Sequence, residues 1–426
     1  MKNKYLILIA LIFFLLSCQS KPVTSLYETE IDSQHTVQPP AQLTEPNTAQ
    51  SPAQTETQTE PRTETIIEPR NDKRRAVRET VQRAVPEYTL SFVAAGDNLF
   101  HDSVINSHFV NGVHDFSPIY TEIKSIIENA DLAFINQETV MAGASYGYSG
   151  YPAFNTPQSL ARTLRETGFD IFNLANNHAM DKGESGLIAT LDFLDTIDGL
   201  TVIGARKEGE SARIITRNNI TFGFLSYTFS LNGIPLPRHN QNLVSMIDRE
   251  KMAAEITALR PLCDFLIVSM HWGAEYILEP NREQINLANF LAQHNVDLII
   301  GHHPHVLQKA DWIVLPDGRK TLCFYSLGNF ASHQRERDRI IGGLMVVTFS
   351  KKGDELSITD SGIIPVVTHF DRSFRNTKIY PLYEYTTELM DRHALRNQGS
   401  GLSMDFFKAT ADRLNTKIFM YNPFIK

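Results

Sequence analysis

The sequence predicts an α/β protein, on two observations. Short runs rich in β-branched and aromatic residues alternate with stretches that have the composition and boundaries of helices, which is the pattern of strand–helix–strand units. In addition, six of these runs end in clusters of polar side chains. Because ligands bind at the carboxyl ends of strands in open α/β sheets, we expect these clusters to meet at one edge.

The six predicted strands occur in order along the chain. They are YTLSFVAAGDN, DLAFINQE, FDIFNLANNH, CDFLIVSMHWGAE, VDLIIGHHPH and LCFYSLGNF. The helices expected between them are SPIYTEIKSIIENA, TPQSLARTLRETG, ESGLIATLDFLDTI and NREQINLANFLAQHN. Three further runs, TFGFLSYTFS, GGLMVVTFS and ELSITDSGIIPVVTHF, have no long helices between them. They indicate either a second sheet or an antiparallel edge of the first.

The first 18 residues have the features of a secretory signal. Lys2 and Lys4 precede a short apolar run, and Leu-Leu-Ser-Cys ending at Cys18 resembles a bacterial lipobox. The resemblance implies cleavage before Cys18 and lipidation of that cysteine; the alternative is an uncleaved membrane anchor. Both place the rest of the chain outside the cytoplasm as a membrane-anchored protein, and Gln19 favours the outer membrane.

Composition divides the rest of the chain. Residues 19–86 are rich in Thr, Glu, Pro and Gln and cannot bury enough apolar surface to fold, so we expect a disordered stalk. Residues 87–380 are the predicted globular domain, and residues 381–426 an amphipathic helical extension. The net charge of −8 argues against nucleic acid as a partner. Cys263 and Cys323 lie beside apolar runs as buried thiols or as a disulfide.

The polar clusters carry the side chains expected of a metal site. They are Asp97, Glu138, Asn177, His178, Asp181, His271, Glu275, His302, His303, His305 and Asn329. Mixed carboxylates and imidazoles favour a divalent transition metal, namely Mn, Zn or Fe, over calcium or magnesium, which prefer oxygen ligands. The set is large enough for one ion or for two ions bridged by a carboxylate.

The stretch GHHPHV is the most specific of these clusters. Three of the 14 histidines fall within four positions, either as metal ligands or as a solvated turn. In an extended chain stiffened by Pro304, His303 and His305 would project to one side, so we expect an extended stretch with these two as ligands. Asp97 and Glu138, taken singly, are equally consistent with turns.

Taken together, the motifs resemble the CapA family of poly-gamma-glutamate capsule biosynthesis proteins, which is similar in fold to calcineurin-like metallophosphoesterases. The matching pieces are AAGDNLFHD, FINQETV, NLANNHAMDKGESGL, SMHWGAEY, IIGHHPHVLQ and YSLGNF, over roughly residues 91 to 330. The resemblance implies a four-layer α/β/β/α metallophosphatase-like sandwich with the metal site at one edge.

The resemblance also implies roles for individual residues. Asp97 and His305 would bind a first ion, Glu138 would hold the bridging position, and Asn177, His271 and His303 would bind a second ion. His178, with Asp181, would act as general acid or stabilise charge. The residues expected just outside the ligands are Asn136, Trp272, Glu275, His302 and Asn329.

The chain departs from the phosphoesterase pattern at the first metal site. An Asp-x-His motif is usual there, but Asn98 and Leu99 follow Asp97. His101 is an alternative ligand that the spacing does not require. The usual Gly-Asp of the second motif is replaced by Asn136-Gln137-Glu138. These departures leave open a single ion on the His271 and His303 side.

Three functions follow as hypotheses. The first is a lipid-anchored extracytoplasmic CapA-like protein that supports synthesis or export of poly-gamma-glutamate, or a related anionic surface polymer, together with a polymer synthase complex. The second is a phosphomonoesterase or phosphodiesterase that uses a metal-bound hydroxide with His178 as acid. The third is a non-catalytic polymer-binding lipoprotein.

Overall fold

The computed structural model describes residues 85–209, 211–397 and 399–424. Cys18, the predicted signal peptide and almost all of the predicted stalk lie outside these ranges. The chain divides into units at Met1–Glu79 and Thr80–Lys426, and the described residues belong to the second. Within them, no helix is both long enough and apolar enough to cross a membrane.

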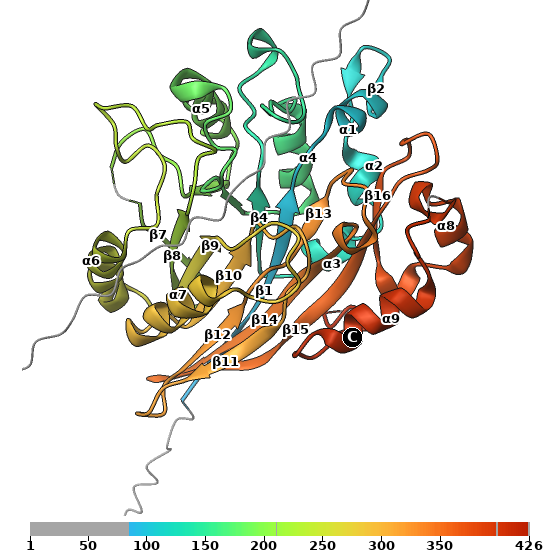
Figure 1. The fold of residues 1–426 in the computed structure, drawn as a ribbon. Helices are drawn as coiled ribbons and strands as arrows, with labels where there is room; N and C mark the ends of the chain where they lie inside the picture. Colours follow the sequence, from blue (N-terminus) through green and yellow to red (C-terminus); the bar gives the residue numbers. More distant parts are fainter. Residues whose placement is uncertain (1–84, 210, 398, 425–426) are drawn as a thin grey trace, which may run out of the picture. The chain divides into compact units, whose positions relative to one another are not determined.

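A mixed sheet of eight strands runs through the middle of the domain (Figure 1). Its parallel strands are β1 (Glu87–Asn98), β4 (Leu132–Gln137), β5 (Ile171–Asn173) and β6 (Thr201–Ile203), with β13 (Asn329–Ala331) beside β1. The antiparallel side is formed by β14 (Ile341–Lys352), β15 (Glu355–His369) and β16 (Lys378–Pro381).

A second sheet of six strands lies against the first. Its order is β11 (Ala310–Val314), β12 (Lys320–Phe324), β10 (Leu298–His302), β9 (Phe265–His271), β8 (Ile220–Thr228) and β7 (Arg213–Arg217). Only the outer pairs are antiparallel. Of the three late strand runs, TFGFLSYTFS forms β8 of the second sheet, as one alternative expected. GGLMVVTFS and ELSITDSGIIPVVTHF form β14 and β15 on the antiparallel side of the first sheet, as the other alternative expected.

Alternation of side chains along β1 explains why the sheets stack. Phe92 and Ala94 belong to the core between the sheets, whereas Val93 and Ala95 belong to the core under the helices, because successive strand residues point to opposite faces. Aromatic pairs such as Phe222 with Phe349, at 5.0 Å between ring centroids, fill the inner layer. Each fully buried Phe contributes roughly 1.5–3 kcal/mol.

Helices cover the outer faces and complete an α/β/β/α sandwich, which confirms the predicted fold class. The first sheet carries α1 (Asp102–Ser107), α2 (Ser117–Tyr120), α3 (Lys124–Glu128), α4 (Ser159–Thr167) and α5 (Gly183–Leu194), and the second carries α6 (Arg249–Leu259) and α7 (Arg282–Gln293). Helix α4 ends at Gly168, which has φ 111°, and α7 begins with a capping box of Asn281 and Gln284.

Two details differ from the helices expected from sequence. The stretch SPIYTEIKSIIENA forms two short helices, α2 and α3, rather than one. The backbone N–H of Ile123 donates to Tyr120 O, three residues earlier, and this tighter turn interrupts the α-helix. Short 3-10 helices occur at Ala144–Tyr146, Arg260–Leu262, Arg337–Arg339, Leu382–Glu384 and Ala394–Asn397, and a hairpin joins β2 (Phe109–Val110) to β3 (Val113–His114).

The C-terminal segment is only partly helical. It contains α8 (Thr387–Arg392) and α9 (Met404–Arg413), separated and followed by turns and extended chain. Leu395 and Phe407 join the core between the sheets, and Ile418 pairs with Ile363 of β15. The segment is therefore packed into the domain as a cover for the antiparallel side of the first sheet.

Candidate metal centre

The carboxyl ends of four parallel strands meet at one edge and bring acidic and imidazole side chains together. Asp97 is the last residue but one of β1, Glu138 follows β4, His271 ends β9 and His302 ends β10. Strands β1 and β4 belong to the first sheet, and β9 and β10 to the second. All four side chains are buried, so the centre lies where the two sheets meet.

Three overlapping triads of possible ligands occupy this edge. They are Glu138 with His271 and His303, Asp97 with Glu138 and His305, and Glu275 with His303 and His305. In each triad the ligand atoms lie within 4.8 Å of one another. The first two triads share Glu138, which thus occupies a bridging position between them. The donor set of imidazoles and carboxylates suits a divalent transition metal.

The loop that carries His303 and His305 is not extended, and that expectation was wrong. Strand β10 ends at His302, and His303 and His305 then take positive φ values of 97° and 58°. Tyr276 and Asn232, on neighbouring loops, also have positive φ values. Positive φ values are uncommon in residues other than glycine. Residues strained in this way tend to cluster at functional sites, where surrounding contacts compensate for the strain.

Asn136 holds the two central carboxylates in place. Its Nδ2 donates to Asp97 Oδ1 at 2.8 Å and lies 3.5 Å from Glu138 Oε2. Its Oδ1 accepts from Asn173 Nδ2 at 2.8 Å. The second oxygen of Asp97 lies 3.0 Å from His305 Nδ1 and accepts from the backbone N–H of His303 at 3.3 Å.

Several buried polar atoms of the cluster have no hydrogen-bond partner within the described part of the chain. They are Glu138 Oε1, His271 Nδ1, His303 Nδ1 and both ring nitrogens of His302. Buried groups of this kind normally find partners, because leaving one unsatisfied costs roughly 1–3 kcal/mol. Since three of these four residues belong to the triads, a bound cation is the partner that their chemistry fits.

Burial and neighbouring charges shift the pKa values of these groups. Burial raises the pKa of Asp97, but the close His302 and His305 rings outweigh it and hold that pKa well below its usual range. Burial and the charge of Asp97 raise the pKa of Glu138 well above its usual range. Burial lowers the pKa of His303 to about 3. A divalent cation would favour the ionised Glu138, and His303 is already in the neutral form that binds metals.

His178 lies beside the cluster with its orientation set. Its Nδ1 is 2.8 Å from Asp181 Oδ2, which also accepts the backbone N–H of Phe154 at 2.7 Å. Because Nδ1 is occupied by its contact with Asp181, Nε2 is the ring nitrogen available for proton exchange. The preceding residue, Asn177, places its Oδ1 2.9 Å from His271 Nε2, which connects this loop to the triads.

The residues expected just outside the ligands are not all at the centre. Asn329 pairs with Asp97 in the sheet, His302 Nδ1 lies 3.5 Å from Asp97 Oδ1, and Glu275 is exposed at one side of the triads. Trp272 lies instead in the core under α7, with its indole N–H donating to Tyr325 O at 2.9 Å.

Other sequence alternatives can now be located. His101 belongs to none of the triads within the described residues. Its Nδ1 lies 3.2 Å from Leu99 O and accepts from the His333 N–H at 3.4 Å. Cys263 and Cys323 are both free thiols, so the disulfide alternative does not hold.

Two residues of the loop after β8 were missed by sequence reasoning. Asn232 accepts a hydrogen bond from Asn177 Nδ2 at 3.2 Å and lies 3.4 Å from His178 Nδ1. The Phe229 ring lies 4.6 Å from the His303 ring. One feature of the sequence could have indicated them. TFGFLSYTFS is also predicted as a strand, and because β8 runs parallel to β9, the residues that follow its carboxyl end lie at the same edge.

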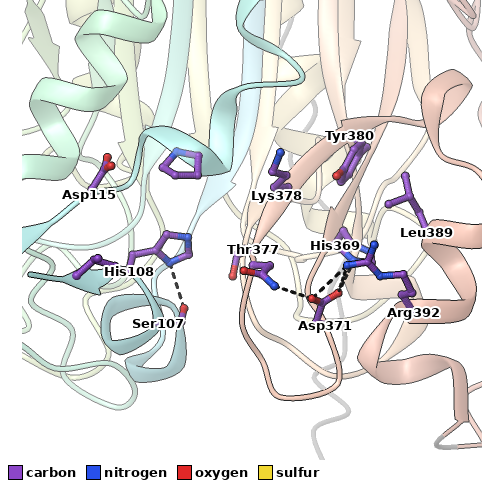
Figure 2. Close-up of a pocket in the computed structure, with 13 residues that line it drawn as sticks. Ser107, His108, Asp115, His369, Asp371, Thr377, Lys378, Tyr380, Leu389 and Arg392 are labelled. Atoms are coloured by element: carbon purple, nitrogen blue, oxygen red, sulfur yellow. Dashed lines mark hydrogen bonds and ion pairs between the residues drawn. The ribbon is translucent and has the colours of Figure 1, made fainter.

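A separate pocket lies between the α1–β2 region and the β15–α8 region (Figure 2). Its charged groups satisfy one another: Asp371 accepts from Asn376 Nδ2 at 2.7 Å and lies 3.3 Å from His369 Nε2, and Lys378 pairs with Glu122 at 2.8 Å. These internal pairings contrast with the unpaired atoms around Glu138. The triads are therefore the candidate metal centre.

Comparisons with known proteins agree with the family resemblance inferred from the motifs. The PGA biosynthesis protein CapA of Bacillus subtilis is 34% identical over 193 residues, covering 43% of this chain and 48% of that protein. The capsule biosynthesis protein CapA of Bacillus anthracis is 31% identical over 189 residues, covering 42% and 43%. The chain thus spans about half the length of the curated relatives it matches.

Solved structures are similar at a lower level. The calcineurin-like phosphoesterase YfkN of Bacillus subtilis is 12% identical with a TM-score of 0.43, over 77% of this chain and 99% of that chain. A phosphatase of Mycoplasma pneumoniae is 16% identical with a TM-score of 0.41, over 66% and 94%. TM-scores this low do not bear on the site.

The family profile covers the strands and loops that build the centre. Residues 91–334 match the profile described as bacterial capsule synthesis protein PGA_cap. This range is more than half of the 426 residues and contains every member of the three triads. The chain belongs to the bacterial capsule synthesis protein family PGA_cap.

Proposed function

We propose that this protein supports the synthesis or export of poly-gamma-glutamate, or of a related anionic surface polymer, through a metal centre at the sheet edge. The observation that carries the proposal is the pair of buried triads that share Glu138 and contain unpaired imidazole nitrogens. The names of the two relatives from Bacillus supply the polymer class. Attachment through a lipidated Cys18, outside the cytoplasm, is part of the same proposal, as is a polymer synthase complex as partner.

The residues present fit one or two ions of Mn, Zn or Fe. Asp97, Glu138 and His305 would hold one ion, and Glu138, His271 and His303, with Asn177 beside them, would hold the other. When bound, such an ion polarises an oxygen of the substrate or of water and stabilises negative charge. Asn136 would keep both carboxylates oriented through its hydrogen bond and close contact.

A second candidate, metal-dependent phosphoester hydrolysis, is favoured by the geometry of His178. Asp181 orients the ring through its contact with Nδ1. The other nitrogen, Nε2, would then donate a proton to a leaving oxygen or stabilise negative charge on a phosphoryl group. The same pair would serve a gamma-glutamyl substrate, because a leaving amine also needs a proton. The position of His178 beside the triads thus supports an enzymatic form of the polymer role.

An activity assay separates these candidates. The full chain, purified in detergent and loaded with Mn²⁺ or Zn²⁺, is tested on phosphoester and gamma-glutamyl substrates together with His178→Ala. His239→Ala is the matched control, because His239 is an exposed histidine paired with Glu184. Turnover lost only in His178→Ala, with metal retained, supports a hydrolase. Metal binding without turnover on either substrate leaves a polymer-binding or accessory role.

A cellular measurement tests the polymer proposal itself. In a strain that lacks the protein we expect less surface polymer, and we expect wild type and His239→Ala to restore it. His303→Ala should fail to restore it, because it removes a ligand from the centre. Unchanged polymer in the strain without the protein would refute the proposal.

A further inference from the structure

Glu275 is the exposed member of the third triad. One of its carboxylate oxygens lies within 4.8 Å of a ring nitrogen of His303 and of His305, which are themselves within that distance of each other. Each of these histidines also belongs to one of the two buried triads. Glu275 therefore borders both predicted ion positions from the solvent side.

An unsatisfied ring nitrogen of His303, a member of the same triad as Glu275, supports a ligand there. His303 is 96% buried, and its Nδ1 has no hydrogen-bond partner in the described part of the chain. Hydrogen bonding to Glu275 is thus not what satisfies this nitrogen. A cation between the imidazole and the carboxylate would satisfy both groups, since each is an electron-pair donor.

The number of ligands gives a second reason. Each buried triad offers three protein ligands to an ion, whereas transition metals in proteins take four or more, including water. His101 lies outside the triads, with its Nδ1 close to Leu99 O and the His333 N–H. Glu275 is the remaining carboxylate that the structure groups with the centre.

The loop that carries Glu275 is tied to the histidine loop. The next residue, Tyr276, has a φ of 67° and donates its backbone N–H to Pro304 O at 2.7 Å. The guanidinium of Arg339 lies 3.3 Å from the centroid of the Tyr276 ring. These contacts keep Glu275 beside His303 and His305 although its side chain is exposed.

We propose that Glu275 is a metal ligand on the open side of the centre, together with His303 and His305, and not only a neighbouring charge. The donor set of two imidazoles and one carboxylate suits Mn²⁺, Fe²⁺ or Zn²⁺. The inference rests on the proposed metal centre and adds a ligand to it. Because this ligand is exposed, the ion that it holds would be open on this side to an anionic substrate group.

The test is Mn²⁺ binding to the full chain in detergent, measured by equilibrium dialysis and elemental analysis. We expect Glu275→Gln to raise the Mn²⁺ concentration for half-occupancy by roughly 10-fold or more, and Glu275→Asp to raise it less. Glu279→Gln is the matched control, since it removes the same charge from the same loop, and it should bind as wild type does. The melting temperature of each metal-free variant shows that folding is unchanged.

Measuring Mn²⁺ binding at high salt distinguishes direct coordination by Glu275 from long-range attraction between its charge and the ion. At about 0.5 M NaCl the influence of exposed charges is largely screened, so a lost ligand still weakens binding whereas a lost surface charge does not. A Glu275→Gln curve that coincides with wild type, or a difference that disappears in salt, overturns the inference and leaves the metal centre standing. Absence of Mn²⁺ binding by wild type overturns the centre and the inference together.

Discussion

Two groups of buried histidines lie at different places along the strand ends of this domain. The metal-centre histidines are His271, His302, His303 and His305, at the strand ends where the sheets meet. The second group is His333, His369 and His393. His369 lines the pocket of Figure 2, His333 contacts Thr377 of its lining, and the His393 ring packs against His369. Burial is the largest cause of the lowered pKa of His271 and His303 in the first group and of His333 and His393 in the second.

The groups differ in what their ring nitrogens contact. His333 places one nitrogen 2.7 Å from Ser103 Oγ and the other 2.7 Å from Thr377 Oγ1. His393 Nε2 lies 3.1 Å from Thr368 O, and its Nδ1 accepts from the Leu395 N–H at 3.1 Å. In the metal-centre group, by contrast, His271 Nδ1 and His303 Nδ1 have no partner within the described residues.

The difference teaches which observation identifies a ligand. Both groups contain buried histidines with a lowered pKa, such as His303 and His393, so neither property separates a structural histidine from a candidate metal ligand. Membership of a triad does separate them: a ring nitrogen of His271, of His303 and of His305 lies within 4.8 Å of two further donor groups, whereas His333, His369 and His393 belong to no such group within the described residues. Substitutions in the two groups should therefore affect different properties.

The largest effect is expected from His303→Ala. We expect the affinity for Mn²⁺ or Zn²⁺ to fall by at least roughly 100-fold, because a ligand of two triads is lost. The melting temperature of the metal-free protein should fall less than in His393→Ala, since the lost packing of the ring on Phe229 is partly offset by removal of a buried nitrogen without a hydrogen-bond partner. Elemental analysis after dialysis measures the first quantity, and wild-type metal content in this variant would contradict the comparison.

His393→Ala should show the opposite result. Removing this ring leaves Thr368 O and the Leu395 N–H without their partner and opens a cavity, so we expect a loss of roughly 2–4 kcal/mol in the free energy of unfolding. Urea unfolding of the metal-free protein measures this loss. Metal content should stay at the wild-type value, and a fall would show that the two groups are coupled.

The same variant also tests the pH dependence of stability. Burial lowers the pKa of His393 from its ordinary 6.5 to about 4, so between these values the unfolded chain binds more protons than the folded chain. His393 therefore contributes stability that is complete above pH 6.5 and is lost as the pH falls toward about 4, by roughly 1.4 kcal/mol per pH unit. His393→Ala should have a shallower slope in this window, and an unchanged slope would contradict the assignment.

The smallest effect is expected from His302→Ala. His302 contacts Asp97 at 3.5 Å and stacks on Phe134 at 5.8 Å, but it belongs to none of the triads within the described residues. We expect metal affinity to change by less than about 10-fold, the lower end of the effect of a residue that orients ligands. A loss equal to that of His303→Ala would mean that His302 is itself a ligand.

Much of the candidate centre could be predicted because its residues follow strands. Asp97, Glu138 and His271 each come directly at or after the end of a buried run, and parallel strands deliver such positions to a common edge. The alternation of β9, continued one residue beyond its end at His271, also predicts the position of Trp272, which joins Val268 and Met270 in the core under the helices. The expectation that Trp272 adjoins the site overlooked this alternation.

The remaining features depended on contacts between distant segments. The positive φ of His303 has no local signal, because a histidine takes that conformation only when surrounding contacts compensate for it. The sequence likewise did not place GGLMVVTFS, because β14 pairs with β1 about 250 residues earlier in the chain. Asn232 was missed for the same reason: its partner His178 lies 54 positions away.

The sequence alone determined which donor atoms are available and that they follow buried strands, because side-chain chemistry and strand periodicity are local properties. The tertiary structure decided which donors are paired and which are free, since pairing depends on how two sheets meet. Asn136, Asp97 and Glu138 interact across adjacent strands. That packing leaves Glu138 Oε1 without a hydrogen-bond partner in the described part of the chain, 3.6 Å from His271 Nε2 and 3.7 Å from His305 Nε2. Only the fold, likewise, placed Glu275 beside His303 and His305.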